Sequence, residues 1–138
     1  MPISAVLTSK EIMSVFTAGS HGSTFGGNPL ACAIGTAALE VLIDEKLDKR
    51  AAKLGAYFMK RLKEMHNPLI TEVRGKGLLI AIELTKEAGP ARKYTEALMR
   101  NGPLAKETHD TTIRFAPPLI IKKEEIDTAI SIIKKTIK

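Results

Sequence analysis

Apolar residues recur every three or four positions in several stretches of the chain, the spacing that gathers them on one face of an α-helix. One such stretch covers residues 30–42, and a second covers residues 47–65. A third stripe lies near the C-terminal end and consists of Ile126, Ile130, Ile133 and Ile137. These patterns predict three helices, and we expect a fourth over residues 91–100.

Capping and breaking residues set the ends of these helices. Asn28 is a favoured N-cap, and Pro29 has its φ already fixed for the first helical position. Pro68 ends the second helix because it cannot continue the hydrogen-bond ladder. The fourth is expected to stop at Asn101-Gly102-Pro103. Residues 11–16 are expected to form only a brief helical turn.

Extended segments are predicted between the helices. They cover residues 2–7, 70–73, 78–84 and 112–121. Arg-Gly-Lys-Gly at residues 74–77 predicts a bend or bulge between the second and third segments. Pro117 and Pro118 interrupt the last segment, which suits an edge strand or a bend.

The order of these elements is strand, glycine loop, two helices, strand, helix, strand, helix. It predicts an α+β fold in which helices cover one face of a small sheet. The first thirty or so residues fit this core poorly. The segment at residues 2–7 has no partner nearby in sequence, and we expect it to belong to a sheet that this chain lacks.

Composition narrows the class of protein. The chain has 138 residues, of which 44% are hydrophobic and 26% charged, as in an ordinary soluble domain. No apolar run is long enough to cross a bilayer, and the first residues do not resemble a signal peptide. The single cysteine, Cys32, excludes an internal disulfide and fits a reducing compartment, so we expect a cytoplasmic protein.

The net charge of +6 comes from 21 Lys and Arg against 15 Asp and Glu. Such an excess could serve nucleic acid or anionic metabolites. The basic residues are scattered and often sit beside acids, as at residues 122–125, and the only aromatic side chains are four Phe and two Tyr. We therefore expect a solvated mixed-charge surface and no nucleic-acid partner.

A glycine-dense stretch at residues 19–27 precedes the predicted helix start and is the strongest local signal. Free backbone N–H groups and the partial positive charge of a helix N-terminus favour an anion. Ser23 and Thr24 add hydroxyl donors, so a phosphate is one candidate guest. A loop shaped by its glycines, with Ser and Thr bonded to backbone, explains the pattern as well. The stretch matches neither a Walker loop nor a dinucleotide fingerprint.

Arg114 is the second signal, because it interrupts the apolar run of residues 113–121. A buried guanidinium needs a partner, and its planar fork suits a carboxylate. That carboxylate could belong to the protein or to a substrate. Residues 74–77 could likewise bind an anion or simply form a tight turn. His21 and His109 stand apart from any metal-ligand spacing, and no nucleophile signature accompanies His109 and Asp110.

Taken together, the sequence Gly-Ser-His-Gly-Ser-Thr-Phe-Gly-Gly-Asn-Pro-Leu-Ala-Cys at residues 19–32 resembles class III aminotransferases, which depend on pyridoxal 5'-phosphate (PLP). Residues 73–79 are similar to a small-domain strand of the same family. Residues 104–109 and 113–119 are similar to the members that act on ornithine. The resemblance runs through the whole chain in register.

The resemblance implies a fold of the aspartate aminotransferase type and a homodimer with active sites at the subunit interface. It also implies transfer of the δ-amino group of ornithine to 2-oxoglutarate. By position, Ser23 and Thr24 match residues that reach the partner's PLP phosphate, and Arg114 matches the arginine that binds the α-carboxylate of glutamate or 2-oxoglutarate. Residues 1–29 correspond to the end of the large cofactor-binding domain, and residues 30–138 to the interdomain helix and small C-terminal domain.

The chain departs from the family in one large respect. The lysine that carries PLP lies, in this family, in a Gly-Lys-Ala-Leu-type segment before the glycine stretch, and that segment is absent here. PLP chemistry needs this lysine, so we expect the chain alone to be inactive. Pro103 also replaces the leucine usual at that position. Two alternatives remain open, a segment of a member acting on acetylornithine and a free-standing anion-binding module.

Overall fold

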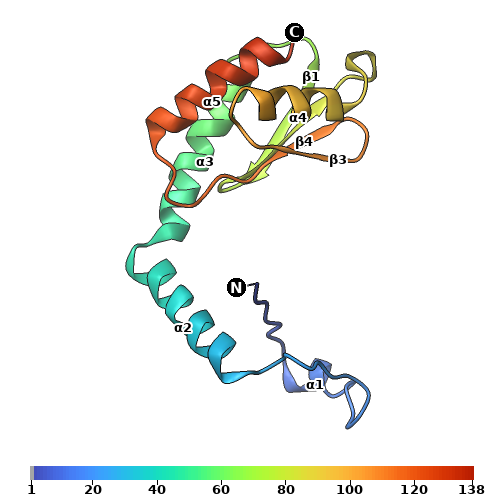
Figure 1. Cartoon of the computed structure of the whole chain (residues 1–138), viewed down its shortest axis with the longest axis vertical. Helices are drawn as coiled ribbons and strands as arrows, with labels where there is room; N and C mark the ends of the chain where they lie inside the picture. The colour runs from blue at the N-terminus through green and yellow to red at the C-terminus, as the bar shows by residue number, and fades with distance from the viewer. Residues whose placement is uncertain (1) are drawn as a thin grey trace. The chain divides into compact units, whose positions relative to one another are not determined.

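The computed structural model describes residues 2–138 (Figure 1). Its elements are α1 (Lys10–Met13), α2 (Pro29–Asp44), α3 (Leu47–Lys63), β1 (Ile70–Lys76), β2 (Leu79–Leu84), the short 3-10 helix η1 (Lys86–Ala88), α4 (Ala91–Arg100), β3 (Lys106–Thr108), β4 (Thr112–Phe115) and α5 (Lys123–Thr136). They divide into two units, Met1–Glu45 and Lys46–Lys138.

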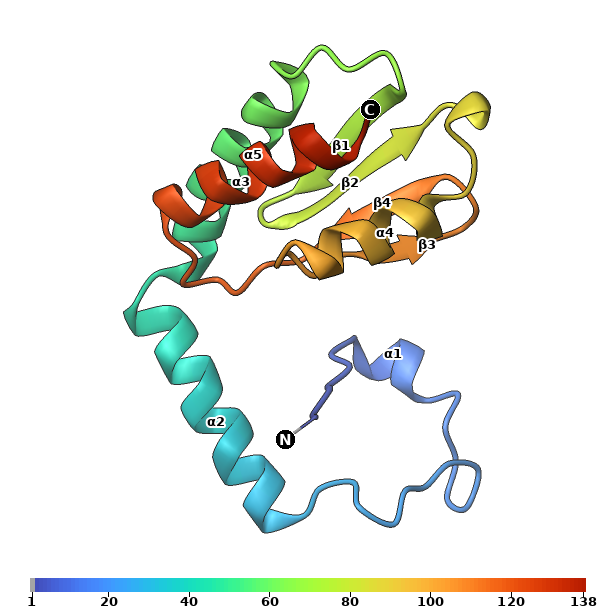
Figure 2. The ribbon, with the colours of Figure 1, turned by 45° about the horizontal axis from the view of Figure 1, so that its top comes forward.

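The second unit is an antiparallel four-stranded sheet in the order β1-β2-β4-β3, with α3, α4 and α5 covering one face (Figure 2). The predicted α+β architecture is therefore confirmed. Alternation along the strands decides which residues face the helices. Ile80, Ile82 and Leu84 of β2 and Ile113 and Phe115 of β4 are buried. Their neighbours point to the other face, which is left uncovered in this unit.

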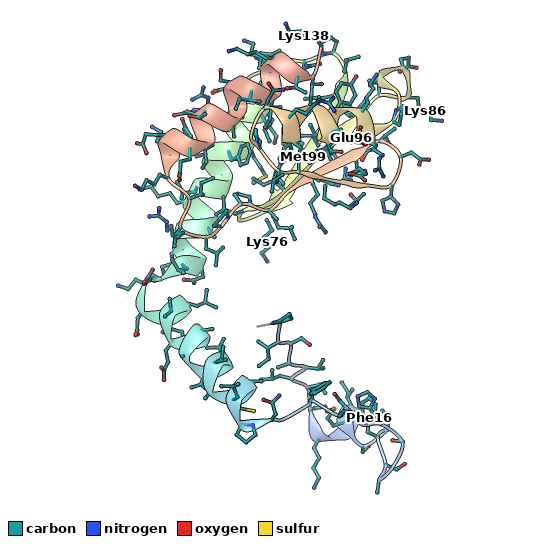
Figure 3. All side chains as sticks on the ribbon, viewed as in Figure 1. Phe16, Lys76, Lys86, Glu96, Met99 and Lys138 are labelled. Carbon is teal, nitrogen blue, oxygen red and sulfur yellow. The ribbon has the colours of Figure 1, made fainter. Side chains whose placement is uncertain are left out.

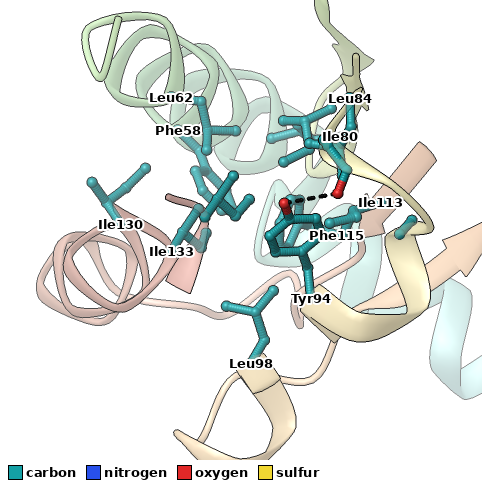
Figure 4. Packing of buried hydrophobic residues seen from close by; sticks show 14 of the residues in the cluster. Phe58, Leu62, Ile80, Leu84, Tyr94, Leu98, Ile113, Phe115, Ile130 and Ile133 are labelled. Atoms are coloured by element: carbon teal, nitrogen blue, oxygen red, sulfur yellow. Dashed lines mark hydrogen bonds between the residues drawn. The ribbon is translucent and has the colours of Figure 1, made fainter. Parts of the chain in front are cut away.

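The core of the second unit forms between these strand residues and the three helices (Figure 4). Phe58 and Leu62 enter it from α3, Tyr94 and Leu98 from α4, and the isoleucine stripe from α5. The stripe residues are Ile126, Ile130, Ile133 and Ile137. Each fully buried side chain of this size stabilises the fold by about 1.5–3 kcal/mol. The unit therefore has an apolar core of its own.

The helix starts and stops agree with the sequence patterns. The Asn28 side chain accepts a hydrogen bond from the N–H of Ala31 at 2.9 Å, and Pro29 is the first residue of α2. α4 spans Ala91–Arg100 as predicted, and α3 ends two residues before the predicted limit at residue 65.

The strands differ more from the predictions. Residues 2–7 form no strand, because no segment among the described residues pairs with them. β1 continues through Lys76, so the expected bend is a two-residue turn at Gly77 and Leu78. Gly77 has a φ of +57°, and α3 lies so close that a Cβ on Gly55 would sit 1.9 Å from the Gly77 carbonyl oxygen.

β4 is shorter than predicted and is not an edge strand. It ends at Phe115, just before the two prolines at residues 117 and 118, which have no N–H with which to extend the ladder. The outer position is taken by β3, a three-residue strand that the apolar pattern did not predict.

The first unit buries little of its apolar surface. No residue of α2 is buried, and α1 is a single exposed turn capped by Ser9. Several large apolar side chains are more than half exposed, among them Phe16, labelled in Figure 3. The others are Ile3, Val6, Leu7, Ile12, Val15, Phe25, Leu30, Leu39 and Ile43. Such a density of exposed apolar residues is typical of a surface that another part of a protein covers.

Candidate phosphate and carboxylate sites

The glycine stretch folds into an exposed loop whose polar side chains brace its own backbone. The Ser23 hydroxyl oxygen accepts from the N–H of Gly26 at 3.0 Å. The Asn28 amide donates to the Phe25 carbonyl at 2.6 Å while it caps α2. Gly19 and Gly27 have φ values of +81° and +70°, a region that L residues rarely enter. The loop thus contains a turn just ahead of the helix.

Two hydroxyl groups of this loop retain the capacity to donate. The Ser23 oxygen acts as an acceptor within the loop, so its proton is available to a ligand. The Thr24 hydroxyl makes no hydrogen bond to residues 2–138, and its residue is exposed. Two donors beside a helix N-terminus fit the donor set that a phosphate group requires. The loop thus presents two hydroxyl donors next to the N-terminus of α2.

Arg114 lies at the centre of β4 and points away from the helices, since Ile113 and Phe115 on either side of it are buried. The expectation of a buried guanidinium is wrong, because alternation places this side chain on the uncovered face of the sheet. It has no carboxylate within salt-bridge distance among residues 2–138. Its five N–H donors are available to an anion.

An ordered cluster of charges lies on the same face. Glu83 of β2 accepts from the hydroxyls of Thr111 and Thr112 at 2.5 and 2.6 Å. Arg74 of β1 donates to Glu72 at 2.7 Å and to Glu83 at 3.1 Å. The two threonine hydroxyls, with the Arg74 guanidinium beside them, hold the pKa of Glu83 below its usual range. Glu83 is therefore a fixed anion at physiological pH.

The sequence predictions missed this cluster, although a signal was present. The segment at residues 78–84, which contains Glu83, is predicted only as extended, and Arg74 is predicted to lie in a bend. The alternation of Ile80, Ile82 and Leu84 marks Glu83 as a residue of the opposite face. The pairing of Arg74 with Glu83 depends on the hairpin register, which the turn at Gly77 fixes.

At the sheet edge, Glu107 of β3 links the strand to α4. Its carboxylate accepts from Lys106 and from the Thr95 hydroxyl, both at 3.0 Å. Hydrogen bonding from its own backbone N–H, followed by the bonds from Lys106 and Thr95, lowers the pKa of Glu107 to about 2. Lys106 is thereby engaged with an anion of the chain.

His21, His109 and Asp110, the other residues considered from the sequence, lie in ring packing and turns. The His21 ring lies 5.4 Å from the Phe16 ring, and His109 occupies the turn between β3 and β4 with a φ of +58°. The Asp110 carbonyl accepts from the N–H of Ala91 at 2.7 Å. Within residues 2–138, no three His, Cys, Asp or Glu side chains gather at a spacing that could hold a metal ion.

The three predicted site residues lie in different units, Ser23 and Thr24 in the first and Arg114 in the second. A pocket of about 600 Å³ in the second unit lies elsewhere, between α5, residues 101–104 and residues 115–118. Its lining is mostly apolar and does not include Arg114. In the part of the chain that the structure describes, no helix combines the length and apolarity needed to span a membrane.

Comparison with known proteins extends over nearly the whole chain. Residues 1–137 match the sequence model of the family described as aminotransferase class-III. An ornithine aminotransferase of Macrococcus caseolyticus is 62% identical over 134 residues, which cover 97% of this chain and 33% of that protein. An ornithine aminotransferase of Brevibacillus brevis is 60% identical over 136 residues, covering 99% of this chain and 33% of the relative.

Solved structures agree with the sequence relatives. The ornithine delta-aminotransferase of Plasmodium falciparum superposes with a TM-score of 0.86 at 46% identity, covering 95% of this chain and 35% of that one. An acetylornithine aminotransferase from Elizabethkingia anophelis gives a TM-score of 0.81 at 49% identity, with the same coverage. The chain spans about a third of the length of the relatives that it matches.

Proposed function

The chain belongs to the class-III aminotransferase family, and on this premise we propose that it forms part of an enzyme that transfers the δ-amino group of ornithine to 2-oxoglutarate. The relatives at 60–62% identity carry the name ornithine aminotransferase, which supports this substrate over acetylornithine. PLP is the cofactor of this family. When bound, PLP supplies the electron sink for moving an amino group between carbon skeletons.

The free guanidinium on the uncovered sheet face is the observation that supports the proposal most. In this proposal Arg114 binds the α-carboxylate of glutamate or 2-oxoglutarate through its planar fork. Arg114 has no carboxylate partner among residues 2–138, so two parallel N–H donors of its guanidinium are available to a ligand. The face that carries it is not covered by the helices of the second unit.

The loop hydroxyls serve the cofactor in the same proposal. Ser23 and Thr24 donate to the PLP phosphate, across the subunit interface of a homodimer, while the N-terminus of α2 adds favourable electrostatic potential. Residues 1–29 then form the end of the large cofactor-binding domain. Residues 30–138 form the interdomain helix and the small C-terminal domain. The exposed apolar residues of the first unit support burial against other parts of such an enzyme.

We also propose that the 138-residue chain on its own has no aminotransferase activity. No segment of Gly-Lys-Ala-Leu type precedes the glycine loop in residues 1–18, so the chain offers no match to the lysine that carries PLP in the family. In this proposal Arg114 orients the substrate, and Ser23 and Thr24 orient the cofactor. None of the three is assigned the proton transfer of the reaction. The activity therefore belongs to a full-length enzyme that carries these 138 residues.

The Arg114→Lys variant of such a full-length enzyme tests the proposal. Glutamate reacts through its α-amino group, so its α-carboxylate lies next to the reacting carbon, whereas ornithine reacts through its δ-amino group at the far end. Lysine keeps the charge but loses the two-point fork, and a hydrogen bond to a charged group contributes about 1.5–3 kcal/mol. Single-turnover absorbance changes should show a severe loss with glutamate and a mild loss with ornithine. Equal losses would leave Arg114 as a structural residue.

A further inference from the structure

A row of side chains crosses the uncovered face of the sheet from one edge to the other. The strand register pairs Arg74 with Ala81, Ala81 with Arg114, and Arg114 with Lys106. Directly paired residues of an antiparallel sheet point to the same face. The row thus holds three cations, with the small Ala81 between its two arginines.

The two arginines are close enough to compete for one anion. Neighbouring strands lie about 4.8 Å apart, so the Cα atoms of Arg74 and Arg114 are about 10 Å apart. Ala81 contributes only a methyl group between them, which leaves the space above it open to both guanidinium groups. A carboxylate ligand at this face therefore meets two guanidinium groups that could each donate to it.

The next row on the same face holds two acids, and both bind one of the two arginines. Glu72 and Glu83 are paired in register and both bind the Arg74 guanidinium. Glu83 is also fixed by two threonine hydroxyls, and its side chain is 25% exposed against 55% for Glu72. Lys106 is engaged by Glu107. Of the three cations Arg74, Arg114 and Lys106, only Arg114 has no carboxylate partner among residues 2–138.

We propose that Glu72 and Glu83 determine the position of the bound carboxylate by occupying Arg74, so that Arg114 is the only guanidinium of the row that can receive it. This inference rests on the proposed function, in which Arg114 binds a substrate carboxylate. Glu72 and Glu83 are positioning residues, since they act through Arg74 and do not touch the ligand. Their removal should free the Arg74 guanidinium to bind the carboxylate as well. A ligand bound to Arg74 would be displaced from the position that it takes on Arg114.

The test measures the binding of glutarate, an unreactive five-carbon dicarboxylate, to the full-length holoenzyme by calorimetry. Arg114→Gln alone should weaken binding about ten-fold or more, because a charge-assisted pair is lost. In the Glu72→Gln/Glu83→Gln background, the same Arg114→Gln change should lower the affinity for glutarate only about two-fold, since the Arg74 guanidinium remains as an equivalent binding group. Adding Arg74→Gln to that background should restore the large loss. A merely structural role of Glu83 would not depend on Arg74.

The outcomes separate the two proposals. If Arg114→Gln leaves glutarate binding unchanged in the otherwise native enzyme, the proposed role of Arg114 fails. If that change weakens binding equally with and without the two acids, the present inference fails alone. Glu64→Gln is the matched control, because Glu64 pairs with Lys60 and Arg61 of α3, a helix on the opposite face of the sheet. Should the double variant not fold, Glu83→Gln alone takes its place, because Glu83 is the less exposed of the two acids that hold Arg74. A loss on Arg114→Gln in that background as large as in the native enzyme then overturns the inference.

Discussion

At the scale of single residues, Ser23 and Thr24 are neighbours with different surroundings. The Ser23 oxygen accepts from the N–H of Gly26, so its loss would also disturb the loop. The Thr24 hydroxyl has no hydrogen-bond partner among residues 2–138, so its removal changes donor capacity with little effect on the fold. Thr24 is therefore the cleaner probe of phosphate binding.

Thr24→Val in the full-length enzyme should lower PLP affinity about ten-fold or more, because one hydrogen bond to a charged phosphate contributes about 1.5–3 kcal/mol. Valine has nearly the same shape and lacks the hydroxyl. The release of PLP on dilution, followed by absorbance, measures the change. Unchanged release would assign Thr24 to the turn alone.

Glu107 predicts an acid dependence of stability. Its pKa is about 2 in the fold against an ordinary value of 4.5, so its stabilising effect is complete above about pH 4.5 and is lost as the pH falls towards 2. Glu107→Gln should lower the unfolding temperature at pH 7, and the difference from the native chain should shrink between pH 4.5 and 2. Calorimetric scans at several pH values measure it, and a constant difference would contradict the assigned cause.

At residue scale, the sequence predicts which side chains are candidates for the site but not the surroundings of each one. Arg114 was predicted as buried because its neighbours are apolar on both sides. The alternation of a strand that is covered on one face reverses that conclusion. Sequence spacing alone could not reveal that Arg74 and Glu83 meet, because their contact depends on the register of a hairpin.

At the scale of elements, helices were more predictable than strands. The isoleucine stripe of α5 and the Asn28–Pro29 start of α2 are local signals that act within one or two turns. A strand forms only when a partner is present, so the apolar segment at residues 2–7 remains unpaired. β3 consists of Lys-Glu-Thr, which has no apolar pattern, and exists through its pairing with β4.

The contact between α3 and the β1–β2 turn gives a test at this scale. A Cβ on Gly55 would lie 1.9 Å from the Gly77 carbonyl oxygen, so Gly55→Ala must push the helix and the hairpin apart. Overpacking of this kind costs about 1–3 kcal/mol. Thermal unfolding of the chain should show the loss. Gly22→Ala, where the added Cβ meets open space, is the control, and similar unfolding temperatures for both variants would disprove the close contact.

At the scale of the whole molecule, the two units differ in how far they can stand alone. The second has a buried core formed by the sheet and three helices. The first exposes most of its apolar side chains, including those of α2, a helix whose apolar residues extend beyond a single face. Such a helix is stable when other protein surrounds it. The relatives that the chain matches are about three times its length.

The central claim is tested most directly by the choice of amino donor. A full-length enzyme that carries these 138 residues, loaded with PLP, is mixed with ornithine or with N-acetylornithine, and the single-turnover absorbance change is followed for each. The account predicts a higher kcat/KM for ornithine, with 2-oxoglutarate completing the cycle. A higher kcat/KM for N-acetylornithine, or no turnover with either donor, would contradict it.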